Sequence, residues 1–134
     1  MITIRAVTLI AVLCAMVLVH GTPAHAQSKA NTLLTQGLAN LENKEVLMLT
    51  VEYGPGQSSA PHRHNAHTFV YVLEGAVVMG VQGKDPVKLE AGQTFYESPA
   101  DVHAVARNAS DTQPAKILVT MIKEKGAPAT VPVK

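Results

Sequence analysis

The chain has 134 residues, of which 11 are lysine or arginine and 10 are aspartate or glutamate, so its formal net charge is +1. Phosphate binding requires a concentrated basic patch and this chain has no block of like charge, so nucleic acid is not an expected partner. A chain of this length suits one small domain rather than two.

The first 26 residues have the layout of a secretory signal peptide. Met1 to Arg5 is short and positively charged, Ala6 to Val19 is an uncharged apolar run, and Ala24-His25-Ala26 has the small-x-small pattern of a cleavage site. The apolar run is shorter than the ~20 residues of a membrane-spanning helix, and an uncleaved anchor is the alternative. We expect cleavage after Ala26 and a secreted or periplasmic protein, free of the membrane, that has lost its only cysteine.

Short runs rich in β-branched and aromatic residues, separated by Gly, Pro and Asp, predict an all-β sandwich or barrel over residues 45–125. Residues 27–44 are expected to form an N-terminal extension with one short helical turn near Leu33–Leu41, and residues 126–134 a C-terminal tail or an edge-strand extension. The expected strands are, in chain order, Glu45–Tyr53, His67–Leu73, Ala76–Gln82, Val87–Glu90, Thr94–Glu97, Val102–Arg107 and Ala115–Lys123.

Four histidines lie outside the leader, and their placement predicts a metal site. His62, His64 and His67 are packed into one short segment, and His103 follows a later turn. Imidazole is the commonest metal ligand in proteins. Alternate side chains of a strand share a face, so His62 and His64 can point together into a barrel. A lone histidine is more often a satisfied polar group, but this grouping is hard to explain as chance.

Two segments resemble the motifs of the cupin superfamily, in the form of a small single-domain bacterial cupin. The first motif comprises Gly56, His62, His64 and a run that ends at Leu73-Glu74-Gly75, and the second is a looser match that comprises Gly92, Ser98, Ala100, His103 and Asn108. The resemblance covers roughly residues 45–123. It implies a double-stranded β-helix, or jelly-roll, barrel.

The resemblance also implies one divalent transition metal, which could be iron, copper, nickel, zinc or manganese, and no other cofactor. Most metal-binding cupins add a glutamate ligand after three or four intervening residues beyond His-x-His, where this chain has Thr68 or Phe69. Either His67 takes that position in a four-histidine site, or the metal has only His62, His64 and His103 and Thr68 faces a position without a protein ligand. We prefer the three-histidine arrangement, because strict alternation directs His67 and Thr68 to opposite faces.

Three neutral imidazoles leave a divalent ion its full charge, which favours a small chelating substrate. Similarity to three-histidine cupins implies a mononuclear, dioxygenase-type oxidoreductase. The alternatives are a non-catalytic periplasmic module that binds a ligand or metal, and an isomerase or lyase of a small polar metabolite. Candidate catalytic side chains, each of which could instead pack the sheet or face solvent, are Tyr71, Tyr96, Glu97 and Glu52. We expect a homodimer, because exposed edge strands invite pairing.

Overall fold

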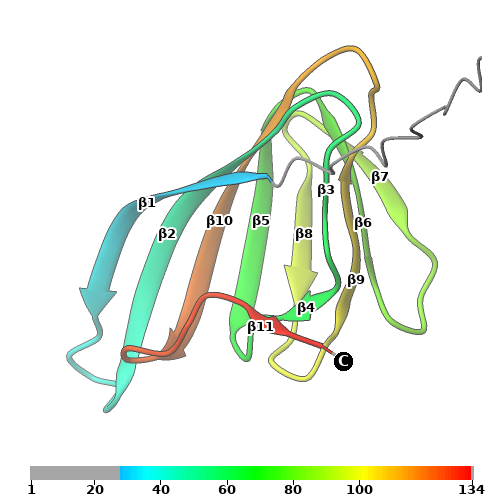
Figure 1. The fold of residues 1–134 in the computed structure, drawn as a ribbon. Coiled ribbons are helices and arrows are strands. Elements are labelled where there is room, and N and C mark those ends of the chain that lie inside the picture. Colours follow the sequence, from blue (N-terminus) through cyan, green and yellow to red (C-terminus); the bar gives the residue numbers. More distant parts are fainter. Residues whose placement is uncertain (1–27, 134) are drawn as a thin grey trace, which may run out of the picture.

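The computed structural model describes residues 28–133, which form two antiparallel β-sheets packed face to face (Figure 1). This part of the chain contains no helix, and therefore none that is long and apolar enough to cross a membrane. The all-β jelly-roll expectation is confirmed. The expected leader and its cleavage site lie outside the described residues.

The first sheet has five strands, and its inner face lines the core. Buried positions alternate with exposed ones along β5 and with half-buried ones along β10, as expected for strands that have one face against the core. The strand order is β1 (Lys29–Gly37), β2 (Lys44–Tyr53), β10 (Ala115–Glu124), β5 (His67–Glu74) and β8 (Thr94–Glu97).

The second sheet has six strands and carries two of the histidines on neighbouring strands. His62 of β4 pairs directly with His103 of β9, so their side chains begin on the same face of this sheet. Its order is β11 (Val131–Pro132), β4 (His62–Arg63), β9 (His103–Asn108), β6 (Ala76–Val81) and β7 (Val87–Glu90), with β3 (Ser58–Ser59) paired to β9.

The helical turn expected near Leu33–Leu41 is wrong, because Lys29–Gly37 forms strand β1 along the edge of β2. All nine residues of β1 are exposed, so hydrophobic burial cannot explain the strand. Pairing with β1 instead satisfies the backbone N–H and C=O groups on the outer edge of β2. At the other end of the chain, Val131–Pro132 pairs with β4, as the edge-strand alternative predicted.

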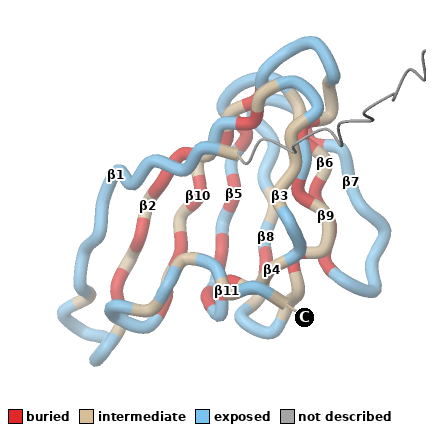
Figure 2. Tube along the Cα trace, viewed as in Figure 1, coloured by how far each residue is buried: buried red, intermediate tan, exposed pale blue. Residues whose placement is uncertain are grey.

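The core lies between the sheets, where buried positions gather on β2, β10, β5, β6 and β9 (Figure 2). Met79 and Met121 are the largest side chains that are almost wholly buried. Two polar side chains, Thr68 and Glu97, are buried just as completely. Burial of polar groups is costly without partners, so these two residues need a local explanation.

Candidate metal centre

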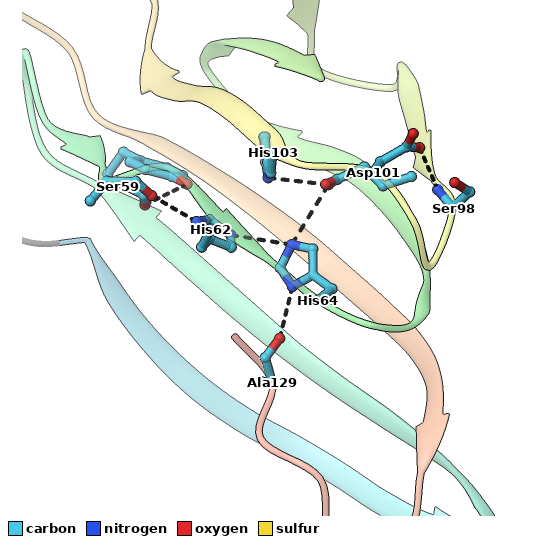
Figure 3. Close-up of polar contacts among 10 residues, drawn as sticks. Ser59, His62, His64, Ser98, Asp101, His103 and Ala129 are labelled. Carbon is cyan, nitrogen blue, oxygen red and sulfur yellow. Dashed lines mark hydrogen bonds and ion pairs between the residues drawn. The ribbon is translucent and has the colours of Figure 1, made fainter. Parts of the chain in front are cut away.

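The structure brings His62 and His64 together with His103, which lies far from them in the sequence. One ring nitrogen from each of them falls in a group whose members lie within 4.8 Å of one another. His62 belongs to β4, His64 follows that strand by one residue, and His103 begins β9. His64 and His103 are buried, whereas His62 is half-buried. Figure 3 shows the three side chains gathered at one point.

Backbone carbonyls fix the orientation of two of the rings. The Nδ1–H of His62 donates to the carbonyl of Ala60 over 2.8 Å. The Nδ1–H of His64 donates to the carbonyl of Ala129, also over 2.8 Å (Figure 3). A carbonyl only accepts, so each neutral ring carries its proton on Nδ1 and a lone pair on Nε2. A hydrogen bond from the second nitrogen is the usual way in which a metal-binding imidazole is held.

These hydrogen bonds turn two lone pairs toward each other. The Nε2 atoms of His62 and His64 are only 3.3 Å apart. Two neutral imidazoles with Nδ1 protonated have no proton to share between those atoms, so the arrangement is repulsive unless a cation lies between them. The donor set therefore fits a metal ion, since imidazole nitrogen is a ligand for zinc, copper, iron and nickel.

A buried carboxylate joins the histidines. Oε1 of Glu97 lies 3.2 Å from Nδ1 of His103 and 3.7 Å from Nε2 of His64. Within residues 28–133, neither ring nitrogen of His103 nor this Oε1 has a hydrogen-bond partner of acceptable geometry, and Oγ1 of Thr68 has none either. Each buried polar group left without a partner costs roughly 1–3 kcal/mol. Several such atoms at one point indicate that the protein holds them for a ligand.

Burial also prepares the protonation states that a metal requires. It lowers the pKa of His103 to about 3, with the neighbouring His62 and His64 adding to the effect. It lowers the pKa of His64 as well, against the opposing hydrogen bond to the Ala129 carbonyl. The same desolvation, reinforced by the nearby Asp101, raises the pKa of Glu97 to about 7. At neutral pH the imidazoles of His64 and His103 are thus uncharged and free to donate their lone pairs.

His67 lies apart from the other three histidines. It is exposed on β5, where its Nδ1 is 2.8 Å from the Tyr96 hydroxyl. Its neighbour Thr68 points inward and is fully buried, as the alternation of the strand requires.

Only one of the four candidate catalytic side chains contacts the histidine group. Tyr71 and Tyr96 are exposed on β5 and β8. Glu52 is also exposed, and it forms a 3.1 Å ion pair with Lys116. Glu97 is the candidate that lies beside the histidines. The hydrogen bond from His64 to the Ala129 carbonyl could not be predicted from the sequence, because any residue supplies a backbone carbonyl.

A cavity of about 390 Å³ adjoins the histidine group and extends between the sheets. Its volume is within the range of small-molecule sites. Apolar side chains form most of the wall, among them Leu49, Val70 and Met79. Tyr53 also lines the cavity, with its hydroxyl 3.2 Å from that of Ser59, and burial raises the pKa of this phenol. The cavity can therefore enclose a small molecule that has an apolar body and a polar end toward the histidines.

Comparison with known proteins agrees with the fold. The family model described as a cupin domain matches residues 49–121, more than half of the chain. No protein of curated function matches the chain.

Solved structures with the same fold are similar over much of the chain. An uncharacterised double-stranded β-helix protein from Klebsiella pneumoniae has a TM-score of 0.62 and 21% identity over 84% of this chain and 90% of its own. A DMSP lyase from Ruegeria pomeroyi has a TM-score of 0.63 and 18% identity, over 83% of this chain and 54% of its own. An oxalate oxidase in complex with the substrate analogue glycolate has a TM-score of 0.56 and 24% identity, over 64% and 45%. This chain spans about half the length of either enzyme.

Proposed function

Because the chain belongs to the cupin domain family, we propose that it is a mononuclear metal enzyme of the dioxygenase type. In this proposal His62, His64 and His103 hold one divalent transition metal, and a small chelating substrate binds beside them in the adjoining cavity. The expected leader would place this activity in the periplasm or outside the cell.

The observation that carries the proposal is the pair of opposed Nε2 atoms, 3.3 Å apart on His62 and His64. The backbone carbonyls of Ala60 and Ala129 hold the two rings in this otherwise repulsive arrangement. Such outer hydrogen bonds set the tautomer and ring direction of metal-binding histidines. A merely structural histidine pair would gain nothing from having both lone pairs face each other.

The metal and the cavity side chains would have different roles in this reaction. When bound, the metal would supply Lewis acidity and a template on which substrate and oxygen are oriented. Three protein ligands leave further coordination positions for substrate, which is typical of catalytic rather than structural metal sites. The apolar side chains of the cavity, such as Leu49, Val70 and Met79, exclude water and pack against the body of the substrate. Tyr53 offers a buried phenol at the wall of the same cavity.

Metal analysis of the purified protein tests the proposal. We expect about one equivalent of a transition metal in the wild type, its loss from His62→Ala, and its retention in His67→Ala, which removes an exposed imidazole outside the group. Oxygen uptake would then be screened with diketones, flavonols and thiol acids, the substrate types of three-histidine cupins. A wild-type protein that binds no iron, copper, nickel, zinc or manganese, even after reconstitution, would refute the proposal.

A lyase or isomerase is the second candidate, and the position of Glu97 is the observation that favours it. Its carboxyl group is buried beside the histidines, and its pKa of about 7 suits a general base at neutral pH. In such an enzyme, Glu97 would take a proton from a carbon next to a carbonyl that the metal polarises. Substrate turnover that proceeds without oxygen would favour this candidate over the dioxygenase.

A further inference from the structure

The inner surface of the barrel contains a buried polar cross-strand pair at the position where the first motif lacks a carboxylate. Thr68 of β5 lies directly opposite Glu97 of β8. Residues opposite each other in an antiparallel pair project from the same face, with Cβ atoms about 5 Å apart. Both side chains are nearly inaccessible, with exposed fractions of 0% and 2%, and both line the cavity beside the histidines.

We propose that Glu97 is the fourth protein ligand of the metal, and that it delivers from β8 the carboxylate that most metal-binding cupins place on the strand of Thr68. This inference rests on the proposed function, because it presupposes that the three histidines bind a metal. Neither the three-histidine nor the four-histidine arrangement predicted from the sequence includes Glu97 as a metal ligand.

The distances match a shared ion. Two donor atoms bound at about 2.1 Å from one metal, at angles between roughly 90° and 110°, lie about 3.0 to 3.4 Å apart. Oε1 of Glu97 is 3.2 Å from Nδ1 of His103, within this range, and 3.7 Å from Nε2 of His64, which corresponds to a wider angle of about 120° at the same bond length. The separation between the Nε2 atoms of His62 and His64, 3.3 Å, falls in the same range. Four donor atoms from three segments of the chain therefore surround one point.

No lysine or arginine among the described residues compensates the buried carboxylate of Glu97. Within residues 28–133, the basic side chains within 4 Å of its carboxylate are His64 and His103. Its Oε1 atom has no hydrogen-bond donor in this part of the chain. Elsewhere the same protein compensates a buried carboxylate fully, since Glu45 receives hydrogen bonds from Lys123 and from the backbone of Gly126.

A carboxylate ligand changes the chemistry expected of the site. Three imidazoles leave a divalent ion a net charge of +2, whereas one added carboxylate leaves +1. Oxygen ligation extends the set of suitable metals toward manganese, which imidazole alone favours less. A bound Glu97 is also not free to act as a general base, so this role and the lyase mechanism exclude each other.

The test compares metal affinity among isosteric variants of the purified full-length protein, titrated with Mn(II) and with Co(II). We expect Glu97→Gln to bind at least about tenfold more weakly than the wild type, since loss of even an outer-shell partner costs 10- to 100-fold. Glu90→Gln, which removes an exposed carboxylate on β7, should bind as the wild type does. Glutamine keeps an oxygen that can accept a hydrogen bond from the His103 ring, so a residue that only positions that ring would tolerate the change.

Exchanging the two residues of the pair, Thr68 and Glu97, gives a second, independent test of the inference. We expect Thr68→Glu combined with Glu97→Thr to bind at least tenfold more tightly than Glu97→Thr alone, because the carboxylate returns to the same point from the other strand. Binding by Glu97→Gln within about threefold of the wild type, or a swap no tighter than Glu97→Thr, would overturn the inference. If His62→Ala still abolished binding in that case, the proposed function would stand without this ligand. A wild type that binds neither metal would refute both.

Discussion

Burial of Glu97 predicts that the site lowers the stability of the protein when no metal is bound. Desolvation raises the pKa of this carboxyl group from 4.5 to about 7. The folded protein therefore disfavours the charged form, and Glu97→Gln removes a charge that the core tolerates poorly. One pKa unit corresponds to about 1.4 kcal/mol, so at pH 8 we expect the metal-free variant to be about 3 kcal/mol more stable than the metal-free wild type.

The direction of the pH dependence follows from the raised pKa. Below pH 4.5 the carboxyl group is neutral in both the folded and the unfolded protein, and the wild type and the variant should then unfold alike. As the pH rises from 4.5 to about 7, the unfolded carboxyl group loses its proton first, and the wild type becomes progressively less stable than the variant. Above that pH the difference should remain constant.

Urea unfolding in the presence of a chelator, at pH 4 and at pH 8, measures this difference. Glu90→Gln is the matched control, because its carboxylate is exposed, and it should show no pH-dependent gain. Excess metal should reverse the order at pH 8, since a ligand stabilises the folded protein that binds it more tightly. A Glu97→Gln variant less stable than the wild type at pH 8 without metal, or a difference independent of pH, would show that desolvation of Glu97 does not govern the site.

Three further predictions concern other parts of the chain. Deletion of residues 128–134 removes the carbonyl that holds His64 and should weaken metal binding by roughly 10- to 100-fold in a titration; unchanged affinity would mean that this hydrogen bond is dispensable. Gly75→Ala should lower the free energy of unfolding by about 1–3 kcal/mol in urea, because the backbone there has a φ of +70° and a Cβ would lie 2.5 Å from the Pro114 carbonyl oxygen. Mass spectrometry of the exported protein should find Gln27 at the amino terminus; an intact leader would contradict the expected cleavage.

Local chemistry in the sequence was sufficient to predict most of the strands. The run Thr94–Glu97 matches β8 fully, and Glu45–Tyr53 and Ala115–Lys123 each fall one residue short of β2 and β10. Turn residues mark where these strands end, and Gly75 adopts the left-handed conformation that its turn requires. The strands that were not predicted, β1, β3 and β4, are exposed or only two residues long, and β11 was predicted only as an alternative. Their pairing depends on a neighbouring strand rather than on their own hydrophobic pattern.

The sequence by itself identified His62, His64, His67 and His103 as metal-binding candidates, because clustering, spacing and a motif are local properties of the chain. Only the tertiary structure decided that His67 lies apart and that Glu97 faces the other three histidines, since this depends on how the sheet that contains β8 packs against the sheet that contains β4 and β9. The carbonyl of Ala129 reaches His64 for the same reason: the chain after β10 crosses to the other sheet and pairs as β11 with β4. Contacts between segments far apart in the chain arise from packing, which spacing along one sequence does not encode.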